Sequence, residues 1–265
     1  MTARVVFEKV SRWYGPVMAL NDVSFELGPG VHGLLGPNGA GKSSLLRLAS
    51  GQIRPSQGSV TLLGHPAFGS PGAFHSVGLC PDTDALFESF TGLQFVTALL
   101  SLHGMGSREA EALATEAIET VDLRDAMHRK VGGYSKGMRQ RVKLAQAIAH
   151  DPELLILDEP LSGMDPIARR KTIRLIRDWG RSGRSVIVSS HILHEIESMT
   201  SNILLINQGR VLAEGDVHQI RDLIDEHPHT VHIRAELPRS LAREFLASEH
   251  VLSLRFEDDA VIVQT

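Results

Sequence analysis

Nine consecutive residues contain a pattern that binds phosphate groups. The pattern is GxxxxGK[ST], and all its fixed positions are present in Gly36, Pro37, Asn38, Gly39, Ala40, Gly41, Lys42, Ser43 and Ser44. The glycines let successive backbone N–H groups turn inward around an anion, and the N-terminus of a following helix favours negative charge. We expect Lys42 to reach the outer phosphates of a nucleotide and Ser43 to ligate Mg²⁺.

The residues on either side of this loop have the order that the pattern requires. Val31 to Leu35 is a short apolar run that predicts a strand, and Ser44 to Leu48 begins a helical pattern. A glycine-rich turn that binds nothing is therefore the weaker interpretation.

Polar residues follow three predicted strands. Asp158 and Glu159 come directly after residues 154–157, a continuously apolar run typical of a strand buried on both faces. His191 follows a similar run at residues 185–189, and Asp82 follows residues 77–79, where Pro81 ends the strand. Ligands of open parallel sheets bind at these carboxyl ends. Each feature alone is more often structural: a solvated acidic pair or a hydrogen-bonded core histidine.

Tyr14 lies in an aromatic turn upstream of the phosphate loop. Its ring can stack on a purine base, or it can cover the edge of the hydrophobic core. The sequence leaves both interpretations open.

The remaining pattern predicts strands at residues 5–10, 19–27 and 59–63, with a loop at 64–72. From Thr91 the periodicity becomes helical, which indicates a helical insert over about 88–150, and Ser107 is expected to cap its second helix. The third helix has an apolar face of Met138, Val142, Ala145, Ile148 and Ala149. Its basic side chains, Arg139, Arg141 and Lys143, are expected on a solvated surface.

The last part of the chain changes character. A helix is predicted at 167–179, a short helix at 192–198, and a hairpin across Gln208 and Gly209. The pattern then predicts a small α+β appendage following Pro228. Its expected elements are strands at 230–235, 251–256 and 260–263, a helix at 239–248 and a turn at Asp258-Asp259. No motif in the appendage carries recognisable chemistry.

Composition limits the classes of protein that fit. The 265 residues are 42% apolar and 22% charged, with a net charge of -4 and no Lys/Arg cluster, which argues against a nucleic-acid binder. Apolar runs fall far short of the roughly 20 residues of a membrane span, so another chain is expected to cross any membrane at which this protein works.

The single cysteine, Cys80, excludes an internal disulfide and lacks an adjacent base. The histidines near Pro228, which are His227, His229 and His232, and the pair His191 and His194 supply no convincing zinc set.

Five motifs in this order resemble an ATP-binding cassette (ABC) ATPase, the nucleotide-binding subunit of a transporter. They are the phosphate loop, Ser135-Lys136-Gly137, Asp158-Glu159, the turn from Ser162 to Asp165, and His191. The resemblance covers roughly residues 4–216. It implies an α/β fold: a P-loop NTPase core with a mixed, largely parallel sheet, an antiparallel β subdomain and the helical insert. The ABC ATPase domain is expected over residues 1–216, followed by the α+β appendage at 217–265.

The resemblance also implies roles for individual residues. Tyr14 stacks on adenine, Asp158 holds Mg²⁺ through water, Glu159 takes a proton from the attacking water, and His191 contacts the γ-phosphate. The implied catalytic set is Lys42, Glu159 and His191, and the metal set is Ser43, Asp82 and Asp158. Beyond the phosphate loop, the implied nucleotide contacts are Tyr14, Ser135, Gly137 and Asp165, with Ser135 and Gly137 acting across a dimer.

Two positions depart from the family pattern. The stretch from Tyr134 to Met138 stands where the sequence Leu-Ser-Gly-Gly-Gln is usual in the family. The sequence of this stretch is similar to that of exporter-type cassettes. Asp82 stands where a glutamine normally ligates Mg²⁺ and senses the membrane partner. Aspartate keeps an oxygen ligand, but it is shorter and adds negative charge beside the phosphates.

The function implied by the resemblance is ATP hydrolysis coupled to transport. Two copies of the chain, or one copy and a paralogous cassette, would enclose ATP head to tail and drive a separate transmembrane permease from the cytoplasmic face of the cell membrane. One alternative is a soluble ABC ATPase that acts as a conformational clamp in assembly or translation. An inactive interaction module is disfavoured because Lys42, Asp158, Glu159 and His191 are all present.

Overall fold

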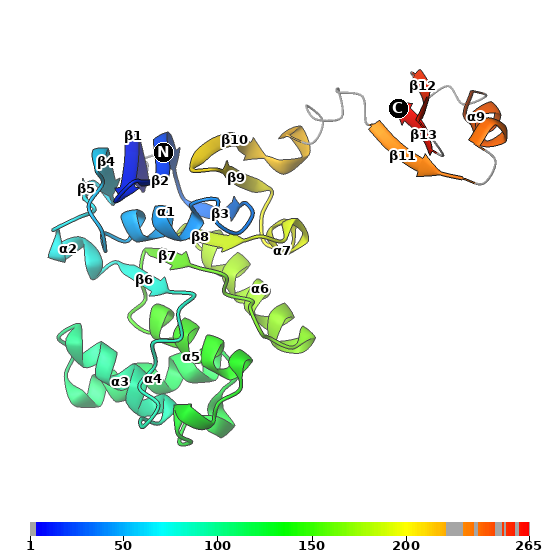
Figure 1. The fold of residues 1–265 in the computed structure, drawn as a ribbon. Helices are drawn as coiled ribbons and strands as arrows, with labels where there is room; N and C mark the ends of the chain where they lie inside the picture. Colours follow the sequence, from blue (N-terminus) through cyan, green and yellow to red (C-terminus); the bar gives the residue numbers. More distant parts are fainter. Residues whose placement is uncertain are drawn as a thin grey trace. The chain divides into compact units, whose positions relative to one another are not determined.

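The structure, a computed structural model, describes residues 4–220, 230–235, 238–246, 251, 253–257 and 260–264. The chain divides into two compact units, Met1–Gly215 and Asp216–Thr265. Figure 1 shows the elements of both units in chain order.

One layer of the larger unit is an antiparallel sheet. Its strands lie in the order β2 (Val17–Leu27), β1 (Val5–Tyr14), β4 (Gln57–Leu62) and β5 (His65–Pro66). Strand β1 continues four residues beyond the predicted end, so Tyr14 is part of the strand and pairs with Val17. The loop predicted at 64–72 is wrong in part, because it contains β5 and the start of the short helix α2 (Pro71–Phe74).

The second layer is a six-stranded sheet. Its order is β10 (Arg210–Asp216), β9 (Asn202–Asn207), β3 (Gly30–Leu35), β8 (Ser185–Ser190), β7 (Leu154–Leu157) and β6 (Val77–Cys80). From β9 to β6 neighbouring strands are parallel, so their carboxyl ends meet at one edge. The hairpin between β9 and β10 turns at Gln208 and Gly209, whose φ angles of 47° and 73° suit a tight turn between antiparallel strands.

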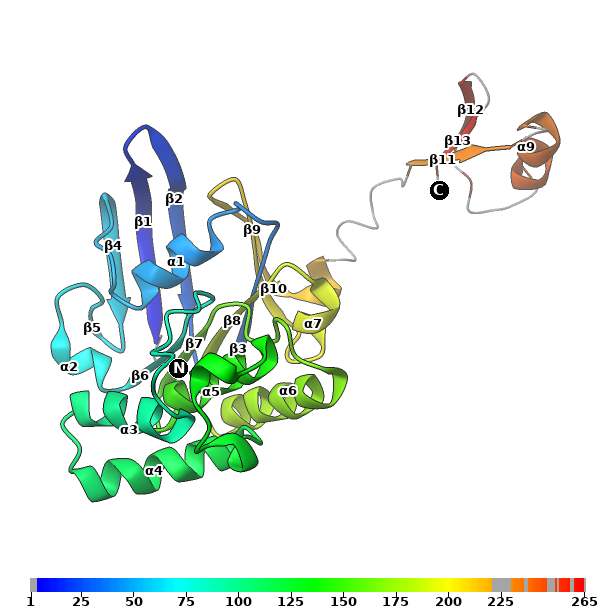
Figure 2. The same cartoon turned by 60° about the horizontal axis from the view of Figure 1, so that its bottom comes forward.

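Helices cover both faces of this sheet, which explains why β7 and β8 are buried at every position. Helix α1 (Lys42–Ala49) lies between the two sheets, and its Leu45 and Leu48 share one apolar core with Phe7 of β1 and Ile156 of β7 (Figures 1 and 2). Helices α5 (Lys136–Ile148), α6 (Pro166–Arg181) and α7 (Leu193–Glu197) pack against strands of the six-stranded sheet.

The predicted helical insert is formed by α3 (Gly92–Leu102), α4 (Ser107–Thr120) and α5, which pack against one another. Thr91 caps α3 in a reciprocal arrangement with Gln94, which satisfies backbone N–H groups of the first turn. The prediction that Ser107 caps α4 is wrong: Gly106 is the capping residue, and Ser107 is the first helical residue.

The smaller unit is an α+β fold. Its strands β11 (Thr230–Arg234), β13 (Ala260–Gln264) and β12 (Ser253–Glu257) form an antiparallel sheet, and helix α9 (Pro238–Leu246) packs on it through Ala242. The predicted turn at Asp258-Asp259 and the expected start at Pro228 lie outside the described residues.

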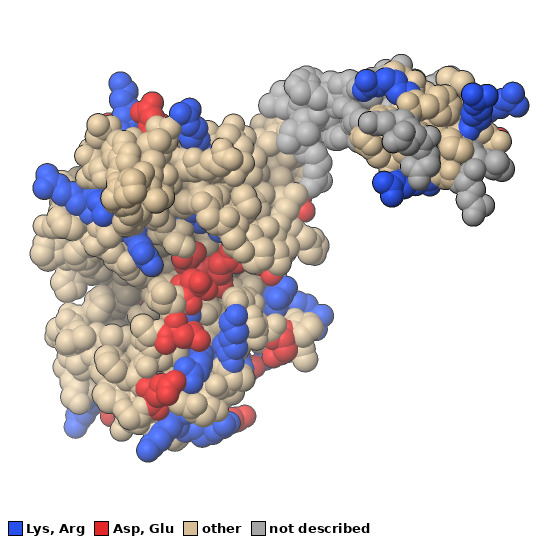
Figure 3. Space-filling model, viewed as in Figure 1, with Lys and Arg blue, Asp and Glu red and all other residues tan. Residues whose placement is uncertain are grey.

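Two surface properties bear on function. No helix in the described ranges has the length and apolar character needed to cross a bilayer. Basic and acidic side chains are interspersed on the face of the molecule in Figure 3, and no broad basic surface appears there.

Candidate phosphate-binding site

The phosphate loop leaves the amide groups at the start of α1 open. The helix begins after Gly41, no side chain caps it, and its first turn carries no acidic residue. Gly41 has a φ of 109°, and a Cβ atom there would lie 2.8 Å from the carbonyl oxygen of Ala19, so only glycine fits. The first N–H groups of a helix lack internal acceptors, and they are therefore available to an anion.

These residues line a cavity of about 310 Å³ together with acidic side chains from distant parts of the chain. Its lining comprises Val17, Met18, Ala19, Pro37, Asn38, Gly39, Gly41, Lys42, Ser43, Ser44, Asp82, Asp158 and Glu159. The fold thus brings the phosphate loop, the Asp158-Glu159 pair and Asp82 to one place, because β3, β7 and β6 end at the same edge of the sheet.

Lys42 is held beside the loop. It is only 7% exposed, and its Nζ atom donates to the carbonyl oxygens of Gly36 at 2.7 Å and Pro37 at 3.3 Å. The same atom lies 3.7 Å from Oε1 of Glu159. A phosphate entering the cavity would compete with Glu159 for this ammonium group.

Ser189, at the end of β8, fixes both members of the acidic pair. Its Oγ donates to Oδ1 of Asp158 at 2.6 Å and accepts from the backbone N–H of Glu159 at 3.0 Å. Ser189 belongs to no sequence motif and was not predicted as a site residue. The available signal was a serine at the end of an otherwise apolar buried strand, where a polar side chain needs a partner.

Glu159 has an unusual backbone conformation, with a φ of 48°. This left-handed region costs a non-glycine residue about 1–2 kcal/mol. Ser189 binds its N–H, and the buried amide of Gln140 donates to its carbonyl oxygen at 3.3 Å. The carboxylate accepts from Nδ1 of His191 at 3.0 Å, so the backbone and side chain of Glu159 are both fixed.

The other nucleotide contacts implied by the family resemblance lie elsewhere and do not line this cavity. Tyr14 is at the end of β1, opposite the cavity residue Val17, and the guanidinium of Arg12 stacks 4.7 Å from its ring centroid. Ser135 caps α5, where its Oγ accepts from the N–H of Met138.

Gly137 packs against the turn that leads into α6. A Cβ atom on Gly137 would lie 2.7 Å from the carbonyl oxygen of Gly163, so a larger residue would push these segments apart. Asp165 caps α6 by accepting from the N–H groups of Ala168 and Ile167. The hydrogen bond from Ala168, followed by that from Ile167, lowers the pKa of Asp165 below its ordinary value.

The three basic residues of α5 are less exposed than the sequence predicts, because Lys143 is buried and Arg139 and Arg141 are half-buried. Arg139 contacts Glu88 at 2.9 Å, Arg141 donates to the carbonyl oxygen of Asp122 at 2.6 Å, and Lys143 is 2% exposed. Helix α5 packs against α3, α4, β6 and β7, so it is buried on more sides than a single apolar stripe indicates.

Cys80 and the histidines of the described ranges are not arranged as a second reaction centre. Burial raises the pKa of the Cys80 thiol to about 12, so the reactive thiolate is not formed near neutral pH. Among the described residues, no group of three or more His, Cys, Asp and Glu side chains is arranged to hold a metal ion. His227 and His229 lie outside the described residues.

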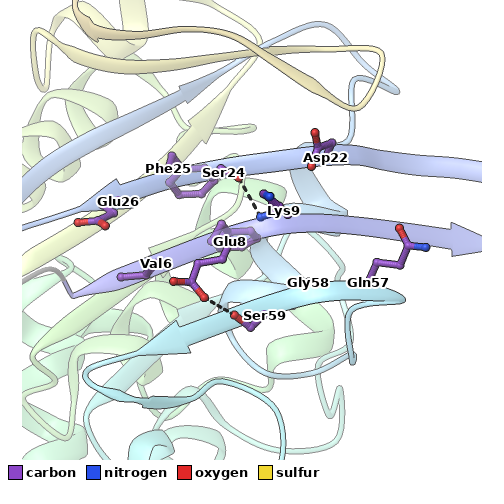
Figure 4. A pocket seen from close by; sticks show the side chains of 11 residues that line it. Val6, Glu8, Lys9, Asp22, Ser24, Phe25, Glu26, Gln57, Gly58 and Ser59 are labelled. Atoms are coloured by element: carbon purple, nitrogen blue, oxygen red, sulfur yellow. Dashed lines mark hydrogen bonds between the residues drawn. The ribbon is translucent and has the colours of Figure 1, made fainter.

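A larger hollow of about 980 Å³ lies on the outer face of the antiparallel sheet (Figure 4). Most of the residues that line it are polar or charged, and two of them bond to their neighbours: Ser59 donates to Glu8, and Ser24 accepts from the N–H of Lys9. No residue assigned a role by the sequence analysis lines this hollow.

Comparisons with known proteins agree with the geometry. A sequence profile of the family described as "ABC transporter" matches residues 20–162. The chain is 36% identical over 228 residues to the "Nod factor export ATP-binding protein I" of Rhizobium etli, an alignment that covers 85% of this chain and 71% of that protein. It is also 36% identical to the "Daunorubicin resistance ATP-binding protein DrrA2" of Streptomyces coeruleorubidus, over 88% of this chain and 73% of that protein.

Solved structures share the fold of the larger unit. The "ATP binding subunit of ABC transporter" has 26% identity and a TM-score of 0.76, covering 84% of this chain and 94% of the solved chain. The dimeric MJ0796, a bacterial ABC transporter cassette, has 21% identity and a TM-score of 0.75, covering 80% and 98%. The predicted P-loop cassette fold is therefore confirmed.

Proposed function

The chain belongs to the ABC transporter family, as an ATP-binding cassette that hydrolyses ATP, and we propose that it powers an export system through a separate permease. The observation that carries the proposal is the shared cavity of the phosphate loop, Lys42, Asp158 and Glu159. Export is favoured by relatives named for Nod factor export and for daunorubicin resistance. Neither name favours the alternative, a soluble ABC ATPase that acts as a conformational clamp in assembly or translation.

The residues at the cavity suit Mg²⁺. Ser43, Asp82 and Asp158 line one hollow of about 200 Å³ beside the phosphate loop, and they offer the hydroxyl and carboxylate oxygens that this cation prefers. Ser189 holds one oxygen of Asp158, which orients the other. When bound, the ion would neutralise charge on the phosphates. Ser43, Asp82 and Asp158 are the residues that would hold it.

The chain's own groups account for the reaction. The open N–H groups of the loop and Lys42 bind and orient the phosphates, which is most of the work in phosphoryl transfer. Glu159 accepts a proton from the attacking water, and His191 holds the Glu159 carboxylate in place. As phosphate binds, Lys42 exchanges its contact with Glu159 for the phosphate oxygens, which frees the carboxylate to act as a base.

We further propose that Ser135 and Gly137 complete the site of a second copy. Ser135 is exposed at the N-terminus of α5, away from the cavity of its own chain. Each reaction centre would then combine Lys42 of one subunit with Ser135 of its partner, and two ATP molecules would hold the dimer together. Tyr14 would stack on adenine, and Asp165 would position the turn that faces the partner.

A mixing experiment tests the shared site. Lys42→Ala and Ser135→Ala are each expected to be inactive, because both centres of each homodimer lack one part. In a 1:1 mixture half of the dimers are mixed and hold one intact centre, so turnover should recover to about a quarter of wild type. A mixture of Lys42→Ala and Glu159→Gln is the control and should stay inactive. Lys42 and Glu159 come from the same subunit in each reaction centre, so every centre of a mixed dimer lacks one of them. No recovery in the first mixture would refute the shared site.

The partner and location are tested separately. We propose that the chain binds a polytopic membrane protein at the cytoplasmic face of the cell membrane. The tagged chain should co-purify with that permease from detergent-solubilised membranes, and ATP turnover should rise in its presence. Full recovery of the tagged chain in the supernatant after membranes are sedimented, without a membrane partner, would contradict this part of the proposal.

A further inference from the structure

Lys143 is a buried cation whose partners all lie in one short segment. Its side chain is 3% exposed, and its Nζ atom donates to the carbonyl oxygens of Pro81 at 2.9 Å, Asp82 at 3.0 Å and Thr83 at 3.3 Å. The same atom lies 3.3 Å from Oδ1 of Asp84. Burying an ammonium group is costly unless its hydrogen-bonding capacity is satisfied, and these four oxygens satisfy it.

The segment from Pro81 to Asp84 has little other support. It leaves β6 at Pro81, which has no N–H group to donate, and its residues 82–84 are exposed and outside regular secondary structure. Lys143 gathers three successive carbonyl groups around one point charge. This arrangement fixes the backbone of the segment without using the carboxylate of Asp82.

Lys143 continues a row of side chains, on α5 and just after it, that bind the free edge of β6 and the segment that follows this strand. One turn further along, the amide of Gln146 donates to the carbonyl oxygen of Leu79, and Nε2 of His150 lies 3.1 Å from that of Val77. Strand β6 is at the edge of its sheet, so these carbonyl groups have no neighbouring strand to bind. The side chains of Gln146 and His150 bind these carbonyl groups instead.

The same helix also touches the reaction centre. Gln140 of α5 holds the backbone of Glu159, and Asp82 lines the cavity beside Ser43 and Asp158. Starting from the proposed function, we infer that Lys143 is a positioning residue that sets the Asp82 carboxylate for Mg²⁺ and ties it to α5, the helix that Ser135 caps. A movement of α5 would then be transmitted to the metal ligand of the same subunit.

Lys143→Met tests the inference, because it removes the ammonium group and keeps a long side chain. Loss of a residue that orients a metal ligand typically weakens metal binding about 10- to 100-fold, so the Mg²⁺ concentration for half-maximal ATP turnover should rise by about 10-fold. The kcat at saturating Mg²⁺ should stay within about threefold of wild type, since Glu159 and Lys42 are intact. Lys143→Arg should recover most of the Mg²⁺ affinity, because it keeps the charge and the donors.

Arg141→Met is the matched control. Arg141 lies on the same helix and donates to backbone carbonyls in a similar way, but those carbonyls belong to Val121 and Asp122 in the helical insert. This variant should lose a similar amount of stability and keep the wild-type dependence on Mg²⁺. A Mg²⁺ shift of equal size in Arg141→Met, or a shift below twofold in Lys143→Met, would overturn the inference.

Amide hydrogen exchange, measured without nucleotide or metal, gives a readout that does not depend on turnover. In Lys143→Met the exchange of residues 82–86 should accelerate by about 10-fold or more, whereas Arg141→Met should accelerate exchange around Asp122 instead. Unchanged exchange at 82–86 would refute the inference whether or not the wild type hydrolyses ATP. A wild type without Mg²⁺-dependent turnover would refute the proposed function alone. If Lys143→Met does not fold, Asp84→Asn provides a milder change at an exposed partner, with a smaller shift expected in the same direction.

Discussion

Replacing Ser189 with alanine removes the side chain that orients both carboxylates of the reaction centre. Two hydrogen bonds are lost: the buried one donated to Asp158 at 2.6 Å and the part-buried one accepted from the N–H of Glu159 at 3.0 Å. The first hydrogen bond is charge-assisted, and loss of the second leaves a part-buried N–H group without its partner. Their combined loss should destabilise the fold by about 2–4 kcal/mol.

Part of this loss should appear in catalysis. Glu159 holds a φ of 48° that its neighbours must maintain, and Ser189 is one of them. If about 1.4–2.7 kcal/mol of the loss falls on the alignment of Asp158 and Glu159 in the transition state, kcat should drop by 10- to 100-fold. Steady-state ATP turnover at saturating ATP and Mg²⁺ measures this, together with urea unfolding of the same preparation.

Ser190→Ala separates a catalytic effect from lost stability. Ser190 is the next residue of β8 and is equally buried, and it also makes one hydrogen bond to a carboxylate and one to a backbone N–H. Its partners are Glu195 and Ile192 at α7, which lie outside the cavity lining. Both variants should unfold more easily, but only Ser189→Ala should lose kcat. Equal losses of kcat, or an unchanged kcat in Ser189→Ala, would refute the reasoning.

Three further predictions address other groups. Glu159→Gln should lower kcat by about 10²–10⁴-fold, because the change removes the base. ATP binding, measured by equilibrium titration, should be retained, because the phosphate loop is unchanged. Turnover at the wild-type rate would exclude Glu159 as the base. Asp82→Gln should keep ATP turnover and change its dependence on Mg²⁺ concentration, since an amide oxygen replaces a carboxylate at the cavity. Complete loss of turnover would count against the assignment of Asp82 as a metal ligand. Burial, followed by the nearby His103, lowers the pKa of His150 from 6.5 to about 4, so this residue stays neutral in the fold. As pH falls, His150 takes up a proton in the unfolded chain before it does so in the folded protein. The free energy of unfolding should therefore decrease between pH 6.5 and 4. The decrease is at most about 3 kcal/mol, and about 1–2 kcal/mol after allowance for the partial exposure of the side chain. His150→Gln should remove this part of the pH dependence in urea unfolding, and an identical dependence in both proteins would contradict it.

Much of the fold and half of the reaction centre could be predicted from sequence alone. The phosphate loop is a contiguous motif, and the buried strands β7 and β8 are continuous apolar runs, so local patterns were sufficient to find them. Because ligands of open parallel sheets bind at the carboxyl ends of the strands, Asp158 and Glu159 were expected at such an end, and together with Asp82 they line one cavity with Lys42. The family resemblance supplied the roles that remain proposals for Ser135 and Tyr14.

Only the tertiary structure identified the groups that hold these residues in place. Ser189 lies 31 positions from Asp158, and Lys143 lies 62 positions from Pro81, so no local pattern links the partners. Periodicity also suggested that Lys143 is solvated, because it assumes one buried face on a helix that is in fact enclosed by several elements. A buried polar side chain acquires its role from the backbone groups that packing brings to it. The sequence thus determined which groups can react, and the packing of distant segments decided what positions them.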